Sequence, residues 1–594
     1  MKRLQVIKSS FTSAAGRPLL LAAGLSGALA LGAQAQGQPG KGKARGTIQD
    51  AEIEIVKDRV NTLPEATRNF EKIRLAPPPK PTRQVTYTYP DFRLPATRLN
   101  PSVQVLTVAQ EELEPLTGNY VKLGLGNYGS VYGRAHLHST RNEQYSYGLD
   151  VRHNSSKNGP VDGQNSGASL TSATATGEYY KGTTALGAAL DFSRDIYHFY
   201  GYDRSKLADA PDADDIRQRF SRFGVRAYAR NRAPDATLQY EVGVGFKHFG
   251  DRYNVSENNF LVNGKAGYAL SETSRITLDA QGSFISDKQP GLVGQTGDLT
   301  RTRNFFQATP AYELTGKTGL SLTLGATLGY SSDALYGVGK GMINPAVRVG
   351  YALVPEKFQL YAGLGGAIQR VTRYDLSQEN PWLAPGQTLA DTHAGPTVYG
   401  GFTATPVSGL ELAARATFGR SRNLYFYRNS LADTSKFDLV YDSTTINVVN
   451  VHAEALYSAS EKVRVGFKAD YNHYGVKALN QAYGRPTFLG TLYGTYNASD
   501  KLLLGANLYY YSRNYGVGYQ VAGGATPLPN PGLPTPIDRQ TNAVIDLSLR
   551  ADYRITPQFS VFAMGNNLTG RRYQRYLNYQ SQGLNVIGGL SYSF

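Results

Sequence analysis

The sequence predicts an all-β protein: a transmembrane antiparallel β-barrel of about 22 strands that follows a short, extended N-terminal segment. Three observations support this prediction. Apolar and polar residues alternate with period two along most of the chain, the last strand ends on an aromatic residue, and 64 Gly and 42 Tyr occur without any Cys. In a membrane barrel, one face of each strand meets lipid and the other faces a polar interior, which produces this alternation.

The first 35 residues are expected to be a secretory signal peptide. A basic start precedes an apolar run at 19–32, and Ala33-Gln34-Ala35 fits the small-residue pattern of a cleavage site. The apolar run is shorter than the roughly 20 residues that a spanning helix needs. We therefore expect an exported chain in three parts: the signal peptide at 1–35, an N-terminal strap at 36–117 and the barrel at 118–594.

Two segments show the alternation clearly. From Leu320 to Tyr330, leucines, an alanine and the final tyrosine share one face, while serine, threonine and glycine share the other. The last strand repeats the pattern and places Leu590, Tyr592 and Phe594 on its apolar face. We expect the apolar faces to meet lipid, and the last strand to close the barrel against a strand near Tyr120–Asn127.

Short turns should alternate with longer loops, because successive antiparallel strands join at alternate ends of the barrel. An even strand count places both termini on the periplasmic side, with the short turns. The predicted short turns are Asn231–Asp235, Ser271–Ser274, Thr315–Gly319, Pro355–Lys357, Pro406–Gly409 and Asn497–Lys501. The predicted long, extracellular loops are Ser155–Ser169, Gly201–Asp215, Asp287–Thr300, Arg373–Asp391 and Tyr515–Arg539.

Composition excludes several classes of site. Without cysteine, the chain has no disulfide, thiolate metal site or cysteine nucleophile. The net charge of +16 could suggest nucleic-acid binding. The cations are scattered along the strands and loops, however, so contact with anionic lipid headgroups or an anion-favouring interior is the better interpretation, and we expect no nucleic-acid partner.

Two clusters have the residue types of a metal site but lack its context. His136 and His138 lie two residues apart on one strand face, which can chelate a metal, but alternation places both inside the barrel beside Arg134, whose charge opposes a cation. The acidic run Asp209–Asp215 lacks the spacing of a calcium-binding EF-hand loop. We interpret the histidines as polar interior lining and the acidic run as a surface loop, and we expect neither a cofactor nor an enzymatic activity.

Two motifs carry a family resemblance over roughly Tyr120–Phe594. The segment Asn380-Pro381-Trp382-Leu383-Ala384-Pro385-Gly386 resembles a loop motif of TonB-dependent receptors, with Gly386 in place of the usual glutamate. The segment from Gly565 to Tyr573 resembles their motif before the last hairpin, with Thr569 in place of phenylalanine. The final strand resembles the C-terminal signature of outer-membrane barrels, which the barrel-assembly machinery reads; this would be the role of Leu590, Tyr592 and Phe594.

The N-terminal strap departs from the resemblance. TonB-dependent receptors carry a globular plug inside the barrel, whereas 36–117 is short, Gly- and Lys-rich at its start and Pro-rich around 76–81, which favours an extended segment. Residues Glu52, Ile53, Glu54, Ile55 and Val56 resemble a TonB box, which would add an edge strand to its partner. The alternative is a strand that pairs inside the barrel or with another periplasmic protein. The strap, inward-folded loops or a separate protein could each fill the wide pore.

Two functions follow from these expectations. The resemblance implies an outer-membrane protein of a Gram-negative bacterium that passes or binds an unidentified solute, like a channel or transporter, with TonB as a possible partner. The apparent lack of a plug favours the alternative, a structural subunit of a larger outer-membrane assembly or export complex. In both cases the barrel contacts outer-membrane lipid.

Overall fold

The structure is a computed structural model, and it describes residues 118–140, 142–204, 207–290, 297–316, 318–333, 335, 338–520 and 535–594. The predicted signal peptide and strap, including Glu52, Ile53, Glu54, Ile55 and Val56, lie outside the described residues. Among those residues, no helix is both long and apolar enough to cross a membrane.

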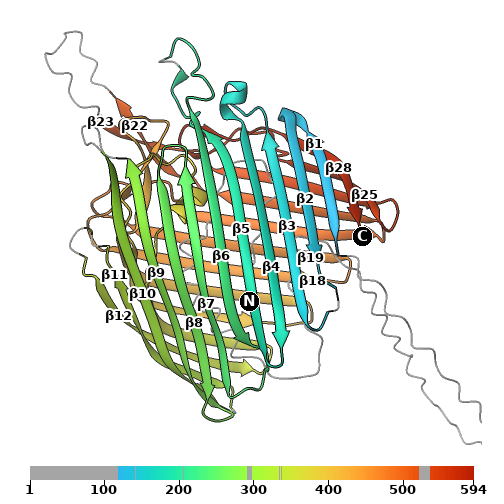
Figure 1. The fold of residues 1–594 in the computed structure, drawn as a ribbon, viewed down its shortest axis with the longest axis vertical. Coiled ribbons are helices and arrows are strands. Elements are labelled where there is room, and N and C mark those ends of the chain that lie inside the picture. The colour runs from blue at the N-terminus through green and yellow to red at the C-terminus, as the bar shows by residue number, and fades with distance from the viewer. Residues whose placement is uncertain are drawn as a thin grey trace, which may run out of the picture. The chain divides into compact units, whose positions relative to one another are not determined.

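Twenty-two antiparallel strands form one closed barrel, as the sequence predicts (Figure 1). The strands are β1 (Tyr120–Gly126), β2 (Ser130–His138), β3 (Tyr145–Ser156), β4 (Ala168–Lys181), β5 (Thr184–His198), β6 (Arg217–Asn231), β7 (Leu238–Asp251), β8 (Ser256–Ala269), β9 (Ser274–Pro290), β10 (Asp298–Thr315), β11 (Leu320–Ser331), β12 (Gly341–Val354), β13 (Phe358–Gln369), β14 (Thr392–Ala404), β15 (Leu410–Arg422), β18 (Ile446–Ser458), β19 (Val463–Gly475), β20 (Phe488–Ser499), β21 (Leu502–Tyr511), β24 (Val544–Arg554), β25 (Phe559–Asn566) and β28 (Asn585–Ser593).

The barrel closes between its first and last strands. β1 pairs with β2 on one side and with β28 on the other, in a register that sets Tyr120 opposite Ser593 and Leu123 opposite Leu590. The terminal Phe594 donates its backbone N–H to Asn119 O at 2.9 Å. The predicted closure is therefore confirmed.

The two faces of the strands differ as alternation requires. In β11, Leu320, Leu324, Leu328 and Tyr330 are exposed on the outer face, while Thr327 points inward and is buried. On the outer face of β28, Leu590 is 61% exposed, and Tyr592 and the adjoining Phe594 are exposed as well. A soluble protein rarely exposes a continuous band of large apolar side chains, whereas lipid accommodates one. The outer face is therefore the face that meets the membrane.

Exposed aromatic residues mark both edges of the apolar band, where a bilayer places its interfaces. The girdle near the longer loops comprises Phe192, Phe223, Phe246, Phe260, Phe284, Phe306, Tyr330, Phe418, Tyr471 and Tyr510. The girdle near the shorter turns comprises Tyr145, Tyr179, Tyr268, Tyr312, Tyr351, Tyr457, Tyr496, Tyr553, Phe559 and Tyr592. Neighbouring rings of the first girdle touch, for example Phe284 and Phe306 with centroids 5.2 Å apart.

The two ends of the barrel carry different connections. One end, the short-turn end, holds the connections from β2 to β3 through β24 to β25, some only two residues long, as at 182–183. The other, the long-loop end, holds long connections such as 370–391, 423–445 and 567–584. The predicted short turns all fall at the short-turn end. β1 begins at this end of the barrel, and β28 finishes there.

One predicted loop has the wrong bounds. The first four residues of Asp287–Thr300 belong to β9 and the last three to β10, with Pro290 and Asp298 in register. These strand ends continue the barrel wall beyond the apolar band, where Asp287 is buried and faces the interior.

Candidate functional site

Four loops at the long-loop end pack on one another and, with the start of a fifth, form a structure that we call the lid. It comprises residues 199–204, 370–391, 423–445, 476–487 and 567–584. Within them lie α2 (Arg373–Glu379), the hairpin β16 (Tyr425–Asn429) with β17 (Phe437–Tyr441), and the hairpin β26 (Gln574–Tyr576) with β27 (Tyr579–Gln580). A further hairpin, β22 (Tyr515–Gln520) with β23 (Thr535–Gln540), lies against β16 through Val517 N–H, which donates to Asn429 Oδ1 at 3.2 Å.

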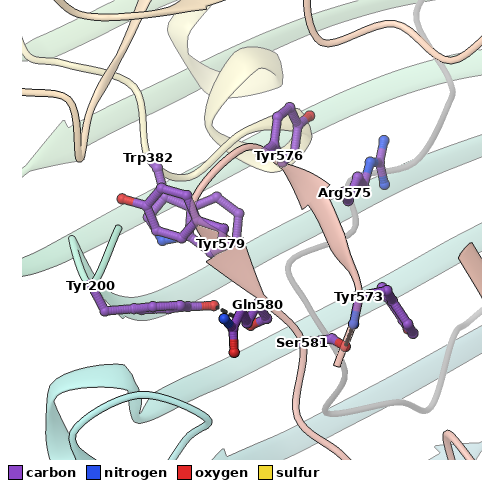
Figure 2. A pocket seen from close by; sticks show the side chains of 8 residues that line it. All are labelled: Tyr200, Trp382, Tyr573, Arg575, Tyr576, Tyr579, Gln580 and Ser581. Atoms are coloured by element: carbon purple, nitrogen blue, oxygen red, sulfur yellow. Dashed lines mark hydrogen bonds between the residues drawn. The ribbon is translucent and has the colours of Figure 1, made fainter. Parts of the chain in front are cut away.

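The lid has its own aromatic core. Trp382 stacks on Tyr579 with ring centroids 3.9 Å apart and planes 26° apart, and Tyr576 meets Trp382 edge-on at 5.9 Å (Figure 2). Further members, all buried, are Phe199, Val371, Leu376, Leu389, Ala390, Tyr425, Tyr427, Phe437, Leu439 and Tyr441. Aromatic pairs of this kind each contribute about 0.5–1.5 kcal/mol beyond the area that they bury, so the core favours one packed arrangement of the loops.

Contacts within the lid cross the interior of the barrel. Lys436, in the loop between β15 and β18, lies 4.9 Å from the ring centroid of Phe199, which follows β5. The Tyr579 hydroxyl donates to Ser435 O of the same loop. Because β5 and β15 are the fifth and fifteenth strands in a ring of 22, ten strand positions separate them, almost half of the circumference. Loops rooted on nearly opposite walls therefore meet.

Loop 370–391 owes its shape to local signals. Thr372 caps α2 by accepting the Asp375 N–H at 3.1 Å, and Pro381 follows the end of the helix, where proline is common. The next residues then join the neighbouring loop: Phe437 N–H donates to Trp382 O at 2.9 Å, and Ala384 N–H to Phe437 O at 2.8 Å. The segment that resembles the receptor motif is therefore the part of this loop that pairs across to β17.

Gly386 explains the departure from that motif. Its φ of +78° lies in the left-handed region, which glycine adopts without a steric penalty. The glutamate that occupies this place in the resembling family would be strained in the backbone conformation found here.

Buried ion pairs fasten loop 370–391 to one wall. Arg373 of α2 places its Nε 2.5 Å from Asp287 Oδ1 on β9, and its backbone N–H donates to Glu257 of β8 at 2.9 Å. On β6, two strands from β8, Arg222 Nη1 donates to the Ser377 hydroxyl at 2.9 Å.

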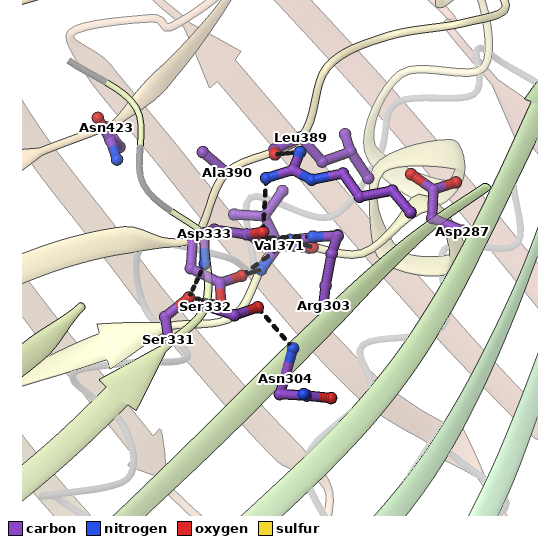
Figure 3. Close-up of polar contacts among 12 residues, drawn as sticks. Asp287, Arg303, Asn304, Ser331, Ser332, Asp333, Val371, Leu389, Ala390 and Asn423 are labelled. Carbon is purple, nitrogen blue, oxygen red and sulfur yellow. Dashed lines mark hydrogen bonds and ion pairs between the residues drawn. The ribbon is translucent and has the colours of Figure 1, made fainter. Parts of the chain in front are cut away.

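The tightest of these attachments surrounds Arg303 of β10. This arginine is 1% exposed and bridges Asp333 at 2.6 Å and Asp391 at 3.0 Å, while it also donates to Val371 O at 2.8 Å (Figure 3). Removing one partner from such a buried set leaves an uncompensated charge, which costs about 3–5 kcal/mol. The set therefore holds the loop in one position.

A cation in an aromatic cage holds the opposite side of the lid. The guanidinium of Arg485 lies 4.6 Å from the ring centroid of Tyr425 and 5.6 Å from that of Phe426, and its Nε donates to Tyr425 O at 3.0 Å. The Tyr425 hydroxyl donates to Glu379 of α2 at 2.6 Å. Burial, reinforced by Glu379, raises the pKa of Tyr425 well above its usual value, so this hydroxyl stays a donor.

A small pocket, with room for about one water molecule, lies within the lid (Figure 2). Its lining is aromatic and cationic: Tyr200, Trp382, Tyr573, Arg575, Tyr576, Tyr579, Gln580 and Ser581. Tyr200 closes one side by donating its hydroxyl to Gln580 O at 3.0 Å. If the lid opened, these residues would suit a planar aromatic or anionic group, because aromatic faces stack on rings and arginine pairs with anions.

The two clusters with metal-site residue types take other partners. His136 Nδ1 lies 3.3 Å from Asp150, a carboxylate that also pairs with Arg134 and Arg152. Asp214 of the acidic run lies 3.1 Å from Arg217. Within the described part of the chain, no group of three His, Cys, Asp or Glu side chains is arranged to hold a metal ion.

The sequence analysis predicted two of the lid loops, Gly201–Asp215 and Arg373–Asp391, and its motif from Gly565 to Tyr573 covers the start of a third. The motif at Asn380–Gly386 pointed to loop 370–391, but the hairpin at 423–445 was not among the predicted loops. Its signal was present in the density of Tyr and Phe at 424–441, which no membrane girdle explains, because those rings are buried inside the barrel.

No protein-family model and no curated protein matches the sequence. Many solved structures match the fold. A siderophore receptor of Acinetobacter baumannii has a TM-score of 0.60 at 11% identity, with 82% of this chain and 81% of that chain covered. A mutant of the ferric enterobactin receptor of Pseudomonas aeruginosa has 0.56 at 13%, with 80% of each chain covered.

The FrpB iron transporter of Neisseria meningitidis gives a TM-score of 0.57 at 13% identity, with 81% of this chain and 82% of that chain covered. This chain has the barrel fold of TonB-dependent siderophore receptors. At such identities the likeness concerns the fold, and it confirms the resemblance that the two motifs and the strand count predicted.

Proposed function

We propose that this protein is an outer-membrane uptake receptor for a bulky solute, with the lid as both the solute-binding surface and the gate of the barrel. The observation that carries the proposal is the lid itself, in which loops from nearly opposite walls meet over the interior around a Trp382–Tyr579 stack. The long-loop end faces the cell exterior, and both chain termini face the periplasm. A transported solute would have to part these loops.

The solute class that fits best is a ferric chelate with aromatic or anionic groups. In the closed lid, the rings of Trp382, Tyr576 and Tyr579 are buried against one another, so the opened lid would present them for stacking and Arg575 for an anion. The solved structures with this fold include receptors named for ferric enterobactin and for siderophores. We further propose that Glu52–Val56 acts as the strand that TonB or another periplasmic protein binds.

The single tryptophan provides the test, because Trp382 is the only one in the chain and lies at the pocket. Purified protein in detergent would be titrated with ferric enterobactin and with ferric pyoverdine while Trp382 emission is followed, and iron retained after gel filtration would be counted independently. We expect saturable quenching for at least one class of ferric chelate, and loss of both signals in Tyr579→Ala. Tyr553→Ala, on the lipid face at the short-turn end, is the matched control and should bind normally.

The alternative function predicts a different result. A structural subunit would bind neither chelate and would co-purify in fixed ratio with other outer-membrane proteins after mild solubilisation. Planar-bilayer recordings would not change on addition of solute. That combination would overturn the proposed receptor function.

A further inference from the structure

A basic patch lies on the outer face of the barrel, just beyond the apolar band. Phe418 of β15 is 52% exposed and belongs to the aromatic girdle at the long-loop end. The next outward positions along the same strand are Arg420 and Arg422, and both side chains are exposed. The intervening Gly419 and Ser421 are buried, so the alternation is unbroken and both arginines point away from the interior.

The neighbouring strand adds polar groups rather than carboxylates. Arg420 is in register with Asn447 of β18, and Arg422 Nε donates to the Thr445 hydroxyl at 2.8 Å. One strand further, His473 is exposed on the same outer face, beyond Tyr471 of the girdle. Among the described residues, neither Arg420 nor Arg422 forms an ion pair with a carboxylate. We call these residues, Arg420, Arg422, Thr445, Asn447 and His473, the rim patch.

The position of the rim patch indicates which class of ligand it can bind. Side chains on the outer face directly beyond the aromatic girdle stand at the depth of lipid headgroups. Arginine binds phosphate through two parallel hydrogen bonds, and two adjacent arginines match a headgroup with more than one phosphate. Below the patch, exposed Phe418 and Val451 offer apolar surface to the acyl chains of the same lipid.

We propose that the rim patch binds a lipid of the outer leaflet whose headgroup carries at least two phosphates. Arg420 and Arg422 would hold the phosphates, with Asn447 and His473 as further hydrogen-bond donors. The proposal takes the long-loop end as the exterior end, as in the proposed function, but it is independent of what the lid binds.

A second pair of exposed arginines on the same rim provides a contrast. Arg194 of β5 and Arg219 of β6 also face outward beyond the girdle residues Phe192 and Phe223. Carboxylates belong to their surroundings, because the adjoining loop carries Asp212, Asp214 and Asp215, and Asp214 lies near two arginines, Arg217 and Arg252, at 3.1 and 3.9 Å. A phosphorylated headgroup would meet these carboxylates there, whereas the rim patch contains none, so the two arginine pairs should differ in lipid affinity.

Native mass spectrometry of the full chain in detergent tests the proposal, with diphosphoryl lipid A, monophosphoryl lipid A and phosphatidylethanolamine as probes. Each cation at an anionic headgroup contributes about a factor of five, so Arg420→Gln with Arg422→Gln should weaken diphosphoryl lipid A binding roughly 30-fold. The matched control, Arg194→Gln with Arg219→Gln, removes the same charge from the same rim and should change binding by less than about threefold. Inorganic pyrophosphate at equal concentration should not compete.

Three outcomes would overturn the assignment. Equal losses in the two double variants would mean that only overall charge matters. Equal binding of the diphosphoryl and monophosphoryl lipids would exclude recognition of a second phosphate. Competition by pyrophosphate would show a general anion site rather than a lipid site. Retained heat-dependent gel mobility in every variant would establish that the barrels are folded, so that a loss of binding reports on the patch.

Discussion

At the scale of single residues, the lid rests on a few side chains whose neighbours leave them little freedom. Trp382 is 4% exposed, stacks on Tyr579 and donates its indole N–H to His198 O at 3.1 Å. Its polar and apolar parts are thus both satisfied, by different elements. Loss of either partner should be visible at Trp382 itself.

Tyr579→Ala should therefore loosen the lid around Trp382. The substitution removes the stacked ring and the hydroxyl that donates to Ser435, and truncation of a buried aromatic costs about 3–5 kcal/mol. Trp382 emission should shift to longer wavelength, and its quenching by iodide should rise. Unchanged emission and quenching would show that the stack does not hold the loops.

Asp391→Asn should destabilise the lid by about 3–5 kcal/mol, because it leaves Arg303 with one fewer charged partner in a buried site. Asp433→Asn is the matched control, since its ion pair with Lys436 is half exposed and should contribute under about 1 kcal/mol. Hydrogen–deuterium exchange of peptides from 370–391 is the measurement. Equal exchange in the two variants would contradict the anchoring role of Arg303.

At the scale of elements, one carboxylate joins two loops of the lid. Asp442 Oδ2 accepts the backbone N–H groups of Lys477 at 2.7 Å and Ala478 at 2.8 Å, while Oδ1 accepts Thr444 N–H at 2.9 Å. Burial raises the pKa of Asp442, but the hydrogen bond from the Thr444 hydroxyl and those from the backbone N–H groups outweigh it and lower the pKa to about 2. Because the pKa of Asp442 is lower in the folded protein than in the unfolded chain, its carboxylate stabilises the fold at pH values above the unfolded pKa. This stabilisation is lost as the pH falls towards 2.

Asp442→Asn should then speed amide exchange at 477–479 by about tenfold at neutral pH, the effect of weakening hydrogen bonds to a charged acceptor. In the wild-type protein, exchange corrected for intrinsic rates should rise as pH falls below about 4, and the variant should lack this pH dependence. A pH-dependent rise of equal size in the variant would assign the effect to another group.

The closing strand allows a test of the lipid face. Leu590→Arg places a charge on the outer surface opposite Leu123 and should destabilise the barrel by up to roughly 2–4 kcal/mol, depending on depth in the bilayer. Ser593→Arg, on the inward face of the same strand, should cost much less. Unfolding in urea, followed by the gel mobility of unheated samples, would measure both. If the serine variant were the weaker one, the assigned faces would be wrong.

At the scale of the whole molecule, the barrel could be predicted from sequence and the packing of the lid could not. Alternation reports which face of a strand meets lipid, so strands such as Leu320–Ser331 and the seam with β28 followed directly. The burial of Tyr425, Tyr427 and Phe437 leaves no periodic signal in the sequence, because the residues that pack against their rings come from other loops. The Asp287–Thr300 error has the same origin: strand that rises above the membrane is polar and resembles loop.

Loops rooted on nearly opposite walls meet across the barrel, and a distance measured across the lid tests this arrangement most directly. Because the chain has no cysteine, spin labels can be placed without altering any native thiol. Labels at Ala432 and at the exposed Arg204, in the lid loops that follow β15 and β5, would be measured by double electron–electron resonance in lipid nanodiscs. We predict a single narrow distance distribution, which Tyr579→Ala broadens. A broad distribution in the wild-type protein, extending to the width of an open mouth, would contradict the account.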